Sequence, residues 1–130
     1  MVTRVSEKDV TVPAIDMRSI TQLAEGEELG DAFVAELIFV FLGDLSERVC
    51  AIGLQLSSGD WAGIKSTAHA IKGSCSHFGA KRLMELSAEV EERAKRQQTD
   101  SLNSAIDSML AEAERVRAAL EAFRADNVPR

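Results

Sequence analysis

The stretch WAGIKSTAHAIKGSCSHF, residues 61–78, carries apolar side chains that are spaced alternately three and four residues apart. This spacing places them on one side of an α-helix, as a stripe that faces a partner helix. The stripe consists of Trp61, Ile64, Ala68, Ile71, Cys75 and Phe78. We therefore predict a helix that starts near Trp61, with Asp60 as its N-cap and Gly59 as the end of a preceding helix.

The same helical pattern recurs elsewhere along the chain. We predict a long helix from about residue 30 to residue 56, another after a break at Gly79, and a last helix after the polar connection KRQQTDS at residues 95–101. A short helical pattern over residues 15–26 follows Pro13, with Asp16 as its N-cap. The three longer stripes are Phe33, Leu37, Phe41, Leu45, Ile52 and Leu56; Leu83, Leu86, Val90 and Ala94; and Leu102, Ile106, Met109, Ala113, Val116, Leu120 and Phe123.

No segment shows the two-residue alternation that is typical of a strand. Four long amphipathic helices with short connections favour an all-α fold, an antiparallel up-down four-helix bundle. The short extra N-terminal helix is expected to cover one end of this bundle. We expect residues 1–12 to form a flexible leader, residues 13–125 the helical bundle, and residues 126–130 a flexible tail.

Composition narrows the classes of partner. The chain has 130 residues, enough for one domain with its own core, and a formal net charge of −6. This charge argues against nucleic acid and anionic membranes as partners, because both demand a basic surface. No apolar run is long enough to span a bilayer and the N-terminus lacks a signal-peptide core, so we expect a cytoplasmic protein. Cys50 and Cys75 lack metal-ligand spacing and are expected to be reduced thiols.

His69 lies off the apolar stripe of its helix. On a helical wheel it is about 130° from the stripe, on the side that faces water. Its helical neighbours are Lys65, Lys72, Gly73 and Ser76. A glycine inside a helix costs about 1 kcal/mol relative to alanine, so Gly73 needs an explanation.

Gly73 is placed where it leaves space beside the imidazole. Helical side chains lean toward the N-terminus, so residue 73 would lean over His69 if it had a side chain. Neutral imidazole is a nucleophile, and the neighbouring lysines offset negative charge. This arrangement suits a histidine that accepts a phosphoryl group. The alternative interpretation is an ordinary solvated histidine among surface lysines.

At these residues the chain resembles a known family. The segment STAHAIKGSCSHFGAKRLMELSAEVEERA, residues 66–94, resembles the signature of histidine-containing phosphotransfer (HPt) domains. That signature has AH, a hydrophobic residue and KGS, then a GA pair, L-x-x-L and an acidic or amide residue. The matching residues are Ala68, His69, Ile71, Lys72, Gly73, Ser74, Gly79, Ala80, Leu83, Leu86 and Glu91.

The resemblance implies a four-helix bundle that relays phosphoryl groups between aspartates of receiver domains. It implies that His69 is the phosphoacceptor, that Gly73 provides clearance and that Lys72 steadies the phosphoryl oxygens. Glu91 falls where the family places a Gln or Glu near the imidazole, and there it would accept the Nδ1 proton and aim Nε2 outward. His77 departs from the pattern: Lys81 stands four residues later, so His77 lacks the clearance and is interpreted as a surface residue.

The same resemblance bears on cofactors and partners. The chain has no P-loop, no glycine-rich nucleotide loop and no acidic cluster for Mg²⁺, so we expect a phosphocarrier without autonomous kinase activity and without a cofactor of its own. The Mg²⁺ would reside on the partner receiver domain. The expected partners are receiver domains of a hybrid histidine kinase and of a response regulator, bound by a monomer. The candidate docking residues beside His69 are Lys65, Thr67, Ala70 and Ser76.

Three rival functions remain. A degenerate HPt-fold scaffold would bind a kinase or receiver domain without carrying phosphate, and folding arguments do not exclude it. A histidine kinase dimerisation domain would need an attached ATP domain, which is absent from this sequence. A metal-binding bundle would need inward-facing His and Glu ligands, whereas both histidines are predicted to face outward.

Overall fold

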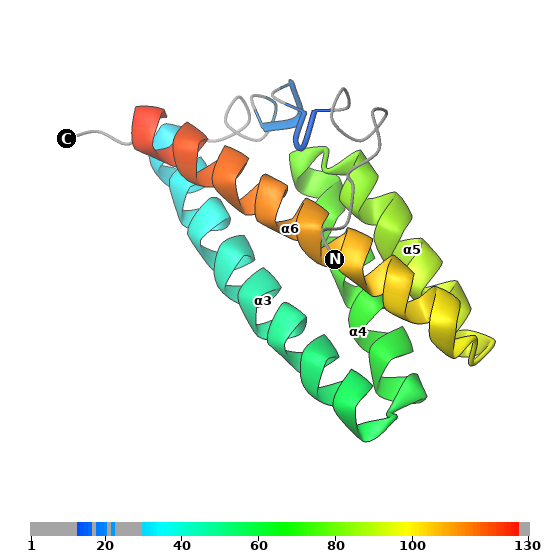
Figure 1. Cartoon of the computed structure of the whole chain (residues 1–130). Helices are drawn as coiled ribbons and strands as arrows, with labels where there is room; N and C mark the ends of the chain where they lie inside the picture. The colour runs from blue at the N-terminus through cyan, green and yellow to red at the C-terminus, as the bar shows by residue number, and fades with distance from the viewer. Residues whose placement is uncertain (1–12, 17, 21, 23–29, 128–130) are drawn as a thin grey trace.

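The computed structural model describes residues 13–16, 18–20, 22 and 30–127, which form a bundle of helices without a strand among these residues. With the labels of Figure 1, the elements are α3 (Asp31–Ser58), α4 (Trp61–Ser74), the 3₁₀-helix η1 (Cys75–Phe78), α5 (Lys81–Lys95) and α6 (Thr99–Asn127). The all-α fold is thereby confirmed. The predicted leader lies outside the described residues, and α6 continues to Asn127, past the predicted boundary at residue 125.

The four long helices form a ring in which each packs against two others. Helix α3 packs against α4 and α6, and α5 packs against the same two helices. The pairs α4–α5 and α3–α6 therefore form opposite sides of the molecule (Figure 1). No helix among the described residues is long and apolar enough to cross a membrane.

Caps and turns define where α4 begins and where α3 ends. The Asp60 side chain accepts a hydrogen bond from the Gly63 N–H at 2.9 Å, which satisfies a free donor in the first turn of α4. Gly59 ends α3 in the left-handed conformation, with φ 68°. Both residues thus act as the sequence predicts.

The predicted stripe of α5 and that of α6 up to Leu120 form the core of the bundle, together with most of the α4 stripe, whereas Phe123 of α6 is half-buried. The side chains of Ile64, Ala68, Ile71, Cys75 and Phe78 are buried, whereas Trp61 is half-buried. The helix that carries this stripe tightens into a 3₁₀ turn after Ser74, a common way for an α-helix to end.

The N-terminal half of α3 differs from its predicted stripe. Val34 and Ile38 are buried there, whereas Phe33 and Leu37 are half-buried. A residue every four positions drifts around a helix that has 3.6 residues per turn, so a stripe of strict fours leaves the core-facing side. The correct stripe combines spacings of three and four, as in α4.

The described N-terminal residues cover the end of the bundle where α4 meets α5. The Asp16 N–H donates to the Phe78 carbonyl at 3.1 Å, and Ala14, Ile15 and Ile20 are buried. The Arg18 N–H donates to Asp16 Oδ1 at 2.9 Å, as expected for an N-cap. Residues 18–20 and 22 are helical, while the rest of the predicted short helix lies largely outside the described residues.

Candidate functional site

His69 projects from the side of α4 that faces solvent. Its side chain is 67% exposed, although Ala68 just before it is fully buried. The outward position predicted from the helical wheel is therefore confirmed. An imidazole in this position is accessible to a macromolecular partner without any rearrangement of the bundle.

Glu91 of α5 connects His69 to Lys72. Its Oε2 atom lies 2.8 Å from His69 Nδ1, and its Oε1 atom accepts a hydrogen bond from Lys72 Nζ at 2.7 Å. An ionised carboxylate only accepts hydrogen bonds, so the proton of a neutral His69 ring belongs on Nδ1. The lone pair then lies on Nε2, the nitrogen that the carboxylate leaves free.

The Glu91 carboxylate is held in its ionised form. The hydrogen bond from Lys72 lowers the pKa of Glu91, and the hydrogen bond that Glu91 accepts from His69 and the charges of both neighbours act in the same direction. Partial burial of the carboxyl group opposes them, because it favours the neutral form. The lowering effects prevail, so Glu91 carries its negative charge at neutral pH.

The space beside His69 is open at Gly73. A Cβ atom built on Gly73 would meet no heavy atom within 4 Å, and the residue is exposed. The glycine therefore does not serve a close packing of helices. It leaves the neighbourhood of the imidazole free on the side of the following turn.

The candidate docking residues do not all lie on the same side of α4. Lys65 and Ser76 are exposed, whereas Thr67 and Ala70 are half-buried. The Thr67 hydroxyl donates to Gln55 Oε1 on α3 at 3.1 Å. The Thr67 hydroxyl is therefore bonded toward α3, whereas His69 is bonded toward α5 through Glu91.

One relationship of the site was not predicted from the sequence. Lys72 was expected to steady phosphoryl oxygens, yet in this structure it is paired with Glu91, 19 residues away on the next helix. Helical spacing alone relates residues three and four apart and gives no register between two helices. The ion pair follows from the packing of α5 against α4.

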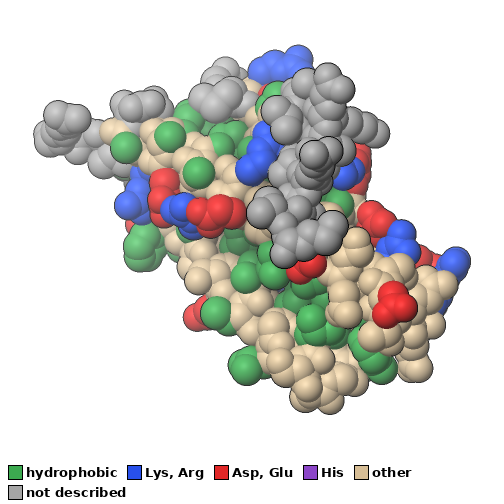
Figure 2. Space-filling view, viewed as in Figure 1, with side chains coloured by type: hydrophobic (Ala, Val, Ile, Leu, Met, Phe, Trp, Pro, Cys, Tyr) green, Lys and Arg blue, Asp and Glu red, His purple; other side chains and the backbone are tan. Residues whose placement is uncertain are grey.

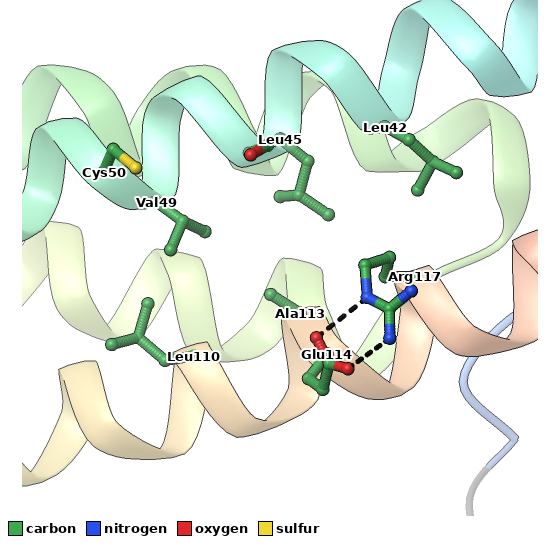
Figure 3. Close-up of a pocket in the computed structure, with 9 residues that line it drawn as sticks. Leu42, Leu45, Val49, Cys50, Leu110, Ala113, Glu114 and Arg117 are labelled. Atoms are coloured by element: carbon green, nitrogen blue, oxygen red, sulfur yellow. Dashed lines mark hydrogen bonds and ion pairs between the residues drawn. The ribbon is translucent and has the colours of Figure 1, made fainter.

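The described residues also form a groove, which lies apart from His69 and Glu91. A mainly apolar groove runs between α3 and α6, on the opposite side of the ring (Figure 3). Figure 2 views that side, with hydrophobic side chains between the two helices and charged side chains along α6. On α6, Arg117 forms ion pairs with Glu114 and Glu121. No cluster of three potential metal ligands occurs in the described part of the chain. His69 therefore lies on an exposed surface, apart from this groove.

Three comparisons with known proteins each find a similarity to phosphotransfer or phosphorelay proteins. A family model described as the Hpt domain matches residues 36–126. The phosphorelay protein LuxU from Vibrio cholerae serotype O1 is 29% identical over 96 residues, which cover 74% of this chain and 83% of LuxU. The crystal structure of the histidine-containing phosphotransfer protein B (HptB) from Pseudomonas aeruginosa PAO1 matches with a TM-score of 0.80 and 29% identity, over 89% of this chain and 98% of HptB.

Proposed function

The chain belongs to the Hpt domain family, and we propose that it carries phosphoryl groups on His69 within a two-component phosphorelay. In this proposal His69 accepts the group from the aspartate of a receiver domain in a hybrid sensor kinase. It then passes the group to the receiver domain of a response regulator. The similarity to a phosphorelay protein and to a histidine-containing phosphotransfer protein supports this assignment.

The observation that carries the proposal is the hydrogen bond between His69 and Glu91. It leaves the Nε2 lone pair of an exposed imidazole available to attack a phosphorus atom. Gly73 leaves room for the approaching receiver, and Lys72 stands one turn from His69 with a charge that can partly offset the phosphoryl oxygens. Lys65, Ala70 and Ser76 supply the surrounding docking surface.

The chain acts as a carrier and substrate and not as a kinase. Phosphoryl transfer depends mainly on positioning and on neutralisation of charge, and the receiver would supply the acceptor aspartate and the Mg²⁺. In this proposal one monomer in the cytoplasm docks to one receiver at a time, because both receivers need the same histidine.

The test is transfer from a phosphorylated receiver domain to the purified chain. We expect acid-labile, base-stable label on the wild-type chain, none on His69→Gln, and normal labelling of the control variant His77→Gln. Circular dichroism and melting temperature should match for all three proteins, because both histidines are exposed. Tight binding of the receiver without any label would support the scaffold alternative, and label on His77 would refute the assigned site.

A further inference from the structure

The large hydrophobic side chains that are exposed among the described residues all belong to α3. They are Phe39, Val40 and Leu54, with exposed fractions of 63%, 53% and 73%. On a helix with 3.6 residues per turn, all three project within about 100° of one another, on the side roughly opposite the buried Ile52. A single exposed apolar residue needs no explanation, but a concentration of them on one side of one helix marks an interaction surface.

This side of α3 is continuous with the groove between α3 and α6. Apolar side chains of the two helices point toward each other across the groove (Figure 3). Cys50 also lines the groove and is itself exposed, so the groove opens directly onto the side of α3 that carries Phe39 and Leu54. We refer to the groove together with Phe39, Val40 and Leu54 as the α3–α6 face. The apolar lining of the groove is Leu42, Leu45, Val49, Leu110 and Ala113.

Gly43 lies on the same side of α3, within about 60° of each of the three exposed hydrophobic residues. It is inside the helix and exposed, and a Cβ atom built on it would meet no heavy atom within 4 Å. A glycine in a helix interior costs about 1 kcal/mol relative to alanine, and no contact among the described residues requires one here. Without a side chain at Gly43, the backbone of another helix can approach α3 closely at this point.

Carboxylates border the α3–α6 face on both sides. Glu36 and Glu47 are exposed on α3, and no ion pair within the described part of the chain neutralises either of them. On α6, Arg117 pairs with both Glu114 and Glu121, so this group of three keeps one negative charge. The apolar centre of the face is therefore flanked by an excess of negative charge.

The charges of the face select the kind of partner. The Arg124 guanidinium lies 5.8 Å from the centroid of the Phe39 ring, so the face already attracts a cation from its own chain. Even with Arg124 counted, four carboxylates stand against two guanidinium groups. This excess repels nucleic acid and anionic lipid, and a second copy of the chain would bring the same carboxylates against each other.

We infer that the α3–α6 face docks a basic amphipathic helix of a partner protein. The apolar side of that helix fills the groove and packs over Gly43, and its lysine and arginine side chains pair with Glu47 on one edge and with Glu114 on the other. The face lies on the opposite side of the ring from α5, whose Glu91 bonds His69. The inference goes beyond phosphotransfer, because a partner bound here leaves the imidazole accessible to a receiver.

The test uses the full chain and a synthetic peptide about four helical turns long. The peptide consists of leucine, alanine and lysine, with the leucines spaced to form one side of a helix. One control peptide has glutamate in place of lysine, and another has the same composition in an order that gives no apolar side. Backbone amide chemical shifts should change in α3 between Glu36 and Leu54 and in α6 between Leu110 and Glu121, and not around His69. The basic peptide should bind at least about tenfold more tightly than either control, and less tightly as added salt screens the carboxylates.

Variants of exposed residues test the face without disturbing the core. Gly43→Gln should weaken binding of the basic peptide by about tenfold, because its side chain prevents the close approach. Gly73→Gln is the matched control: it makes the same change at an exposed and open glycine of α4 and should bind the peptide as the wild type does. Leu54→Ser should weaken binding several-fold, and Glu47→Gln should reduce its salt dependence. Melting curves confirm that each variant is folded.

Equal affinity of the wild type and Gly43→Gln, equal binding of the basic and acidic peptides, or shift changes outside the face would each overturn the inference. A dimer in sedimentation velocity that Leu54→Ser abolishes would also overturn it, because the occupant would then be a second copy of the chain. None of these measurements involves phosphate. A failure to label His69 would therefore refute the proposed function and leave the docking of a basic helix standing.

Discussion

The Cβ atom of Asp16 occupies the space into which a Cβ atom on Gly79 would project. Gly79 also has a φ of 61°, in the left-handed region that other residues rarely adopt. The Asp16 N–H donates to the carbonyl of Phe78, the residue just before this glycine. Gly79 therefore both turns the chain from η1 into α5 and leaves room for the N-terminal segment.

Gly79→Ala should destabilise the protein more than Gly59→Ala. Both glycines have positive φ, so each substitution costs roughly 1–2 kcal/mol in backbone strain. A Cβ atom built on Gly59 meets no heavy atom within 4 Å, whereas the methyl group that Gly79→Ala introduces would collide with Asp16. Urea unfolding of the two variants measures the difference, and equal loss of stability would mean that the Asp16 contact is absent in solution.

Gly73→Ala should stabilise the protein, by up to about 1 kcal/mol on helix propensity alone. Gly73→Gln should keep the fold and sharply reduce transfer, because its side chain would lie over His69. Gly53 in α3 is a matched control: it is also exposed and open around a built Cβ. Gly53→Gln should leave transfer unchanged. Destabilisation by Gly73→Ala would contradict the clearance argument.

Lys72→Ala should slow phosphoryl transfer or shorten the lifetime of phosphorylated His69, without unfolding the bundle. The phosphoryl group adds nearly two negative charges, which the ammonium group of Lys72 helps to offset. Lys81→Ala, at the exposed start of α5, removes the same charge elsewhere and should behave as the wild type. Rapid-quench kinetics measure the rate of transfer in both variants. Identical rates for Lys72→Ala and Lys81→Ala would show that Lys72 has no role in transfer.

Glu91 should contribute stability that is lost in acid. Its pKa in the folded chain lies below the ordinary value of 4.5, chiefly because Lys72 donates a hydrogen bond to it. The unfolded chain then binds more protons at acidic pH, so this stability is complete above about 4.5 and vanishes as pH falls through the folded pKa. The urea midpoints of the wild type and Glu91→Gln, compared between about pH 6 and pH 3, should converge toward the acid end. A constant difference would contradict this linkage.

The two cysteines should differ in reactivity. Cys75 is fully buried and burial raises the pKa of its thiol to about 12, whereas Cys50 is exposed. Because the thiolate is the reactive form, the folded protein should release one equivalent with Ellman's reagent, and the denatured protein two. In Cys50→Ser the folded protein should give almost none. Rapid reaction of Cys75 in that variant would show that the core opens readily.

The sequence predicted the helices better than it predicted the contacts between them. The alternating spacing in α4 identified the core side of that helix and therefore the outward position of His69. The prediction for α3 spaced apolar residues strictly four apart and was wrong in the first two turns of the helix. Val34 and Ile38 are buried there, whereas Phe33 and Leu37 are half-buried. The Glu91 contact with His69 came from family resemblance, because periodicity within one helix gives no register against the next.

The three hydrogen-bonded residues of the site, His69, Lys72 and Glu91, lie within one helical hairpin, which consists of α4 and α5 joined by η1. The longest separation among them is the 22 residues between His69 and Glu91. Closing so short a loop costs little chain entropy, and contacts between near neighbours in sequence form quickly. The contact between the carboxylate and the imidazole can therefore form early in folding, before the 29-residue helix α6 has packed against the hairpin.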